Sequence, residues 1–238
     1  MTTPSEAEDL SSIVRLAQDL VRAPSRGGID DYAPAVAVVK DWLSGHGLEP
    51  RVLADGRQPV AVVADVAVRR PGPRYVLDAP LDTAAFGDTE RWSFPPAAGD
   101  VVDGWLRGRG AADSKIAISI FCRIAARPRA RPLDAGSVTL VFDLDEHTGG
   151  FAGIRAYLAE QDGAPIDGVM IGYPGSDKII IGGRGFYRAR LAGLARGVDD
   201  EVRLLLDQIR RFRQPRQRRD HVMVGRRART GRVENGDP

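Results

Sequence analysis

The chain is poor in cysteine and has no long apolar run. Its 238 residues include one cysteine, Cys122, so no intrachain disulfide can form. No stretch reaches the roughly 18 apolar residues that a membrane-spanning helix needs. The start, MTTPSEAEDL, is acidic and polar, whereas a secretory signal has a basic start followed by an apolar stretch. These absences predict a cytoplasmic protein that acts without a membrane.

Charge gives no general reason to expect a nucleic acid as partner. The 34 basic and 32 acidic side chains nearly cancel, to a formal net charge of +2. Hydrophobic residues make up 43% of the chain, which is enough for a buried core. Lysine is scarce, so most of the positive charge is carried by arginine.

Predicted strands and helices alternate along the chain. Apolar residues at helical spacing, or a buried apolar run followed by polar residues, predict helices over residues 5–22, 31–46, 113–127 and 149–161. Short β-branched runs bounded by turn residues predict strands over 59–66, 74–80, 137–145 and 167–175, and a hairpin over 178–193. This alternation predicts an α/β fold, a three-layer α/β/α sandwich around a mostly parallel mixed sheet.

Polar side chains follow several of the predicted strands. In open α/β sheets, ligands bind at the carboxyl ends of the strands. The residues just past predicted strand ends are Asp82, Glu146, His147 and Tyr173. A long polar connection over 81–110 lies nearby in the sequence, and such loops are often functional.

The composition changes after Ala195. Residues 196–238 are rich in arginine, with one possible amphipathic helix and no periodicity beyond Pro215. We therefore expect a catalytic-type domain over 1–195 and an arginine-rich, partly disordered tail over 196–238. A shifted reading frame would produce the same abrupt change, and an intact-mass measurement would test for it.

Four short motifs carry the chemistry. They are LDAPLDT (77–83), GRGAADSK (108–115), DLDEHTGG (143–150) and MIGYPG (170–175). With WSFPP (92–96), their order and spacing resemble the zinc-dependent aminoacylase and carboxypeptidase family, whose members include acetylornithine deacetylase, succinyl-diaminopimelate desuccinylase and glutamate carboxypeptidases. The resemblance runs from about residue 10 to about residue 193. It implies a zinc-exopeptidase-like fold, a pair of zinc ions and hydrolysis of amide bonds in N-acyl amino acids or small peptides.

The resemblance implies a role for each matched side chain. Asp113 matches the aspartate that bridges the two zinc ions, and Glu146 matches the general base that acts on water. His147 stands at the position of an acidic ligand, where an imidazole also binds zinc well. Asp82 matches an aspartate that orients a histidine ligand from behind.

Amide hydrolysis needs this combination for physical reasons. An amide carbonyl is a poor electrophile and water is a poor nucleophile at pH 7, and zinc improves both by polarising the carbonyl and lowering the pKa of water. A carboxylate that moves the proton to the leaving nitrogen contributes roughly a hundred- to ten-thousand-fold. The neighbours Glu146 and His147 can divide the tasks of base and ligand between them.

Tyr173 and Arg184 are the candidate substrate contacts. A tyrosine hydroxyl can donate a hydrogen bond to an oxyanion, and Arg184, with Arg188, can bind a substrate carboxylate. Each has a plainer alternative: Tyr173 can pack at a strand end, and the arginines can lie on a solvated strand face.

The chain departs from the family pattern at three ligand positions. Pro80 stands where the first histidine ligand is expected, and Tyr173 where an acidic ligand is expected. The last histidine ligand has no counterpart that we identify, although His221 is a remote candidate. Asp113 and His147 remain, so we expect partial zinc occupancy or none. The domain through which family members form homodimers also has no expected counterpart.

Three functions remain open from the sequence. The first is a metal-dependent hydrolase of N-acyl amino acids or small peptides. The second is a catalytically inactive, truncated remnant with an incomplete metal site. The third is binding of a nucleic acid or another acidic partner by the basic run over 210–219, which would be strongly salt-dependent. A solvated tail without a partner is the plainer alternative to the third.

Overall fold

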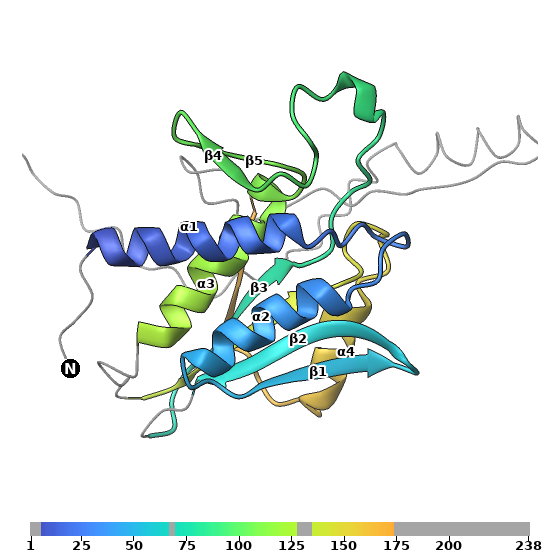
Figure 1. Ribbon diagram of the computed structural model, residues 1–238. Coiled ribbons are helices and arrows are strands. Elements are labelled where there is room, and N and C mark those ends of the chain that lie inside the picture. The colour runs from blue at the N-terminus through green and yellow to red at the C-terminus, as the bar shows by residue number, and fades with distance from the viewer. Residues whose placement is uncertain (1–5, 67–69, 128–134, 174–238) are drawn as a thin grey trace, which may run out of the picture. The chain divides into compact units, whose positions relative to one another are not determined.

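The computed structural model describes residues 6–66, 70–127 and 135–173 (Figure 1). All of them belong to the first of two compact units, Met1–Ile179. The predicted hairpin over 178–193, with Arg184, and the predicted arginine-rich tail lie outside the described residues. Within the described ranges, no helix has the length and hydropathy to cross a membrane.

A five-stranded mixed sheet forms the centre of the described part. Its strands stand in the order β1 (Pro50–Asp55), β2 (Gln58–Val66), β6 (Ser137–Asp143), β3 (Arg74–Pro80) and β7 (Gly168–Ile171). Strands β1, β2 and β6 pair antiparallel, whereas β3 runs parallel to both β6 and β7. The parallel half, β6–β3–β7, is the part that carries the candidate site.

Three helices cover one face of the sheet. They are α1 (Glu6–Arg22), α2 (Ala33–Gly45) and α3 (Ile116–Ala126). Their apolar stripes form one buried core with the strand residues that point the same way, such as Phe142 of β6 and Ala79 of β3. The helical spacing in the sequence therefore corresponds to real burial, as for Leu16 and Leu20 of α1.

A single helix of the described part, α4 (Ala152–Glu160), lies on the opposite face (Figure 1). Its Tyr157 is buried with Val63 and Val141 in a second, smaller core. Side chains alternate along a strand, so β6 sends Phe142 to one core and Val141 to the other. The structure thus confirms three α/β/α layers around a mixed sheet.

The long connection over 81–110 has structure of its own. It contains the short 3₁₀ helix η1 (Thr89–Arg91) and a two-stranded ribbon, β4 (Asp100–Val102) with β5 (Trp105–Arg107). After the ribbon, the distorted turn η2 (Ala111–Lys115) leads into α3. The helix predicted from residue 113 therefore begins only at Ile116.

Candidate metal and catalytic site

The candidate site forms where β3 and β6 end side by side. The two strands are parallel, and Pro80 of β3 pairs with Asp143 of β6. The N–H of Leu81 donates to the Asp143 carbonyl at 2.6 Å, which extends the pairing beyond β3. The segments that follow the two strands therefore leave the same edge of the sheet together.

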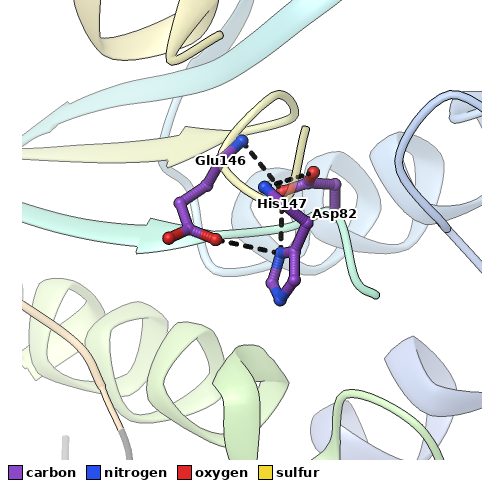
Figure 2. A group of neighbouring side chains, drawn as sticks. All are labelled: Asp82, Glu146 and His147. Carbon is purple, nitrogen blue, oxygen red and sulfur yellow. Dashed lines mark hydrogen bonds and ion pairs between the residues drawn. The ribbon is translucent and has the colours of Figure 1, made fainter. Parts of the chain in front are cut away.

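Asp82 holds the turn that carries Glu146 and His147. Its side chain is fully buried, and its Oδ2 accepts the N–H of His147 at 3.0 Å. Its Oδ1 accepts the N–H of Glu146 at 3.3 Å and lies 3.4 Å from Nδ1 of His147 (Figure 2). One carboxylate thus fixes both the backbone of the turn and the orientation of the imidazole.

His147 places its two ring nitrogens among carboxylates from three segments. Nδ1 lies 3.1 Å from Oε2 of Glu146, and Nε2 lies 3.6 Å from Oδ2 of Asp113. The hydrogen bond with Asp82 is the largest of the effects that raise the pKa of His147, and burial opposes it. This surplus of negative charge favours a cation at the imidazole, either a proton or a metal ion.

Asp113 reaches the site from a separate element, the turn η2. Two ligands of one tetrahedral zinc ion, each about 2.0–2.1 Å from the metal, lie about 3.4 Å apart. The 3.6 Å between Oδ2 of Asp113 and Nε2 of His147 is close to that separation. These two side chains therefore fit a shared ion.

Glu146 stands beside the imidazole with its side chain partly buried. Burial is the largest cause that raises the pKa of its carboxyl. Nearby His147 lowers this pKa, while Asp82 and Asp113 raise it. A carboxylate with a raised pKa accepts a proton more readily near neutral pH, as a general base must.

Two further carboxyl groups lie beneath the site, and the sequence analysis missed both. The buried Asp143 accepts the N–H of Asp145 at 2.6 Å and the N–H of Ile154 at 2.7 Å, so it fixes the site turn to the start of α4. Burial raises the pKa of Asp78 to about 7, and Asp143 and Glu146 add to the effect. Asp78 lies within the mostly apolar strand β3 and Asp143 is the last residue of β6, and an acid in or directly after an apolar run is the sequence signal that could have marked them.

The two departures from the family pattern that can be examined differ in kind. Pro80 is buried at the end of β3 and offers no side-chain donor. Tyr173 is exposed, and the Asp113 carboxylate is the largest cause that raises the pKa of its hydroxyl, so the two groups are neighbours.

His46 lies elsewhere, stacked on Trp42 at the end of α2 with ring centroids 3.7 Å apart. Arg184 and His221 lie outside the described residues.

The described donors fit one metal ion better than two. Asp82, Glu146 and His147 offer ligand atoms that lie within 4.8 Å of one another, but both Asp82 oxygens already accept backbone N–H groups. Asp113 and His147 are therefore the better ligand pair, with Glu146 beside them. In the described part of the chain, no further histidine or cysteine approaches this pair.

Comparisons with known sequences place the chain in a family. The model of peptidase family M20/M25/M40 matches residues 76–224. Succinyl-diaminopimelate desuccinylase of Phenylobacterium zucineum is 33% identical over 198 residues, covering 79% of this chain and 50% of the relative. The corresponding protein of Rhodospirillum centenum is 30% identical over 191 residues, covering 76% and 49%. The chain spans about half the length of the curated relatives it matches.

Solved structures share the fold. An M20 family metallo-carboxypeptidase from Sulfolobus solfataricus superposes with a TM-score of 0.58 at 15% identity, over 69% of this chain and 37% of that one. Human carnosine dipeptidase 1 gives 0.55 at 18% identity, over 72% and 39%. At these identities the likeness concerns the fold alone, whereas the family model covers more than half of the sequence. The chain belongs to peptidase family M20/M25/M40.

Proposed function

We propose that this chain binds a single zinc ion and hydrolyses the amide bond of N-acyl amino acids or small peptides. The observation that carries the proposal is the 3.6 Å between Oδ2 of Asp113 and Nε2 of His147. Relatives named as succinyl-diaminopimelate desuccinylases support an acyl–amino acid amide as the substrate class.

Asp113 and His147 would hold the ion, through Oδ2 and Nε2. The bound metal supplies a Lewis acid for the amide carbonyl and for water. Asp82 orients the ligand histidine. Its carboxylate accepts a hydrogen bond from Nδ1–H of His147, so that the unprotonated Nε2 faces the Asp113 carboxylate. In the family pattern the matching aspartate orients a histidine expected at the position of Pro80, and in this chain Asp82 orients His147 instead.

Glu146 is the general base of the proposed reaction. Its carboxylate lies beside the imidazole, and burial raises its pKa. It removes a proton from the attacking water and delivers that proton to the leaving nitrogen, so that the C–N bond breaks with a neutral amine as leaving group.

Tyr173 is proposed to donate its hydroxyl proton to the oxyanion that forms on the substrate carbonyl. The raised pKa of this hydroxyl, caused mainly by Asp113, keeps it protonated and able to donate. Arg184 is proposed to bind a substrate carboxylate.

The alternative is a catalytically inactive member that retains the scaffold. Pro80 favours this alternative, because a position expected to supply a ligand has no donor atom. A two-ligand site also binds zinc more weakly than the three or four protein ligands of ordinary zinc sites.

Zinc titration and hydrolysis assays on the full chain distinguish the two. We expect the metal-stripped protein to bind about one zinc ion, and Asp113→Asn and His147→Ala to lose it. Glu146→Gln should keep zinc binding while hydrolysis of N-acyl amino acids falls roughly a hundred- to ten-thousand-fold. Glu160→Gln, on the exposed end of α4, is the matched control and should leave both unchanged.

Each outcome has a separate meaning. Zinc binding without turnover on a panel of N-acyl amino acids would favour the inactive alternative. No zinc binding, or full activity in Glu146→Gln, would refute the proposed hydrolase mechanism.

A further inference from the structure

Three arginine–aromatic stacks occur in and around the connection over 81–110. The guanidinium of Arg26 lies 4.3 Å from the ring centre of Phe86, that of Arg107 5.5 Å from Phe94, and that of Arg109 5.1 Å from Trp92. Such contacts orient an arginine while leaving the edge of its guanidinium plane free to donate hydrogen bonds.

The three arginines differ in their other partners. Arg26 is neutralised by Asp30, with contacts of 2.6 and 2.8 Å. Arg109 has no acid or carbonyl acceptor for its side chain among the described residues, and its Nε is buried without a hydrogen-bond partner. A buried donor that lacks a partner is uncommon and calls for an explanation, such as an acceptor that arrives with a ligand.

Two contacts tie this stack to the segment that follows Asp82. Trp92 donates its indole N–H to the carbonyl of Phe86 at 2.9 Å, and Phe86 follows Thr83 by three positions in the chain. Gly110, next to Arg109, packs so closely on Thr83 that a Cβ at Gly110 would lie 2.5 Å from the Thr83 methyl. Thr83 directly follows the buried Asp82.

The reach of the arginine also suits a group attached to the substrate. Asp113 follows Arg109 by four positions in the chain, so their Cα atoms are at most about 14 Å apart. Trp92 is only partly buried and lines a surface hollow. The residues that line this hollow are Asp88, Arg91, Trp92, Ser93 and Phe94. Space therefore exists beside the indole for a bound molecule.

We propose that Arg109, stacked on Trp92, binds a carboxylate of the substrate. This inference rests on the proposed function for the identity of the ligand. A guanidinium and a carboxylate match through two parallel N–H···O bonds, and a stacked guanidinium loses little freedom when it forms them. The carboxylate is either the one on the acyl chain or the α-carboxylate of the amino acid.

Equilibrium binding to the full chain tests this, in EDTA so that neither zinc nor turnover is needed. Three ligands of nearly equal size separate the two sources of carboxylate. N-succinyl-L-alanine amide carries only the acyl carboxylate, N-butyryl-L-alanine carries only the α-carboxylate, and N-butyryl-L-alanine amide carries neither. Calorimetry gives the affinity, and tryptophan emission reports a change beside Trp92.

We expect one of the two acids to bind at least about tenfold more tightly than the neutral amide. Arg109→Gln should abolish that preference. Arg107→Gln, two residues earlier at the end of β5 and also beside an aromatic ring, is the matched control and should preserve it. Trp92→Leu keeps the charge but removes the stacking ring, and should reduce the preference while leaving the protein folded.

The inference is overturned if Arg109→Gln retains the preference, or if Arg107→Gln removes it equally, because general positive charge would then suffice. It is also overturned if neither acid binds better than the neutral amide. Failure of the zinc titration would refute the proposed hydrolase and leave this metal-free result standing, so the two failures are distinguishable. A melting curve for each variant separates loss of binding from loss of fold.

Discussion

Replacing Asp82 by asparagine tests how far one buried carboxylate organises the site. Both carboxylate oxygens accept backbone N–H groups, at 3.3 Å from Glu146 and 3.0 Å from His147. An asparagine has one oxygen, so its NH₂ group must face one of the two N–H donors. The change therefore removes one charge-assisted hydrogen bond and leaves a donor without an acceptor, at a cost of about 1.5–3 kcal/mol.

The same substitution should weaken metal binding through the ring of His147. Loss of a group that orients a ligand histidine typically lowers metal affinity about 10- to 100-fold. Urea unfolding of the metal-free protein measures the first effect, and zinc titration measures the second. Asp65→Asn is the control: its carboxylate also accepts hydrogen bonds, but its side chain is 59% exposed, so we expect a loss within about 1 kcal/mol. Equal stability of the two variants, with unchanged zinc affinity in Asp82→Asn, would refute the orienting role.

Two further predictions concern pH. Burial raises the pKa of Asp78 to about 7, above the value of about 3.9 expected in the unfolded chain. The contribution of Asp78 to wild-type stability should therefore fall as the pH rises from about 4 to 7. At pH 8, Asp78→Asn should be more stable than the wild type by up to about 4 kcal/mol. Hydrogen bonds from Arg127 and Arg123 lower the pKa of Asp9. The stabilising contribution of its carboxylate is therefore present above about pH 4 and is lost as the pH falls below it. Asp9→Asn should reduce the loss of stability that the wild type shows below about pH 4.

Urea unfolding of the metal-free protein across pH 3–8 checks both predictions. Asp55→Asn, at the exposed end of β1, provides the control and should follow the wild-type curve. An Asp78→Asn variant that is less stable than the wild type at pH 8 would contradict the desolvation argument. An Asp9→Asn variant whose stability still falls steeply below pH 4 would contradict the other.

Periodicity predicted most of the elements, and it failed where few side chains are buried. The helices α1 and α2 and the strands β2, β3 and β6 have continuous apolar runs or apolar stripes, and each lies within a few residues of its predicted range. Strand β1 was not predicted, because Leu53 is its one buried side chain and no alternation is visible. The strand predicted over 167–175 is shorter, because the ladder with β3 ends at Ile171.

Strand-end reasoning and family resemblance contributed different parts of the site. The positions just past predicted strand ends indicated that Asp82, Glu146 and His147 would share one edge of the sheet, and their ligand atoms lie within 4.8 Å of one another. Asp113 lies in a turn between a ribbon and a helix, and only the motif GRGAADSK linked it to that edge. Asp78 and Asp143 were missed because a sequence pattern does not indicate how strongly a carboxyl group is desolvated.

The position of Pro80 explains how the site can lose a ligand without losing its geometry. The Asp82 carboxylate accepts hydrogen bonds from the backbone N–H groups of Glu146 and His147, and those bonds do not depend on the side chain at position 80. The ring of His147 then takes the orienting contact, because its Nδ1 lies 3.4 Å from the same carboxylate. Its other nitrogen faces Asp113 from that fixed orientation. A proline at the strand end therefore offers no donor and leaves the Asp113–His147 pair in place, which supports the proposed one-ion centre over a two-ion centre.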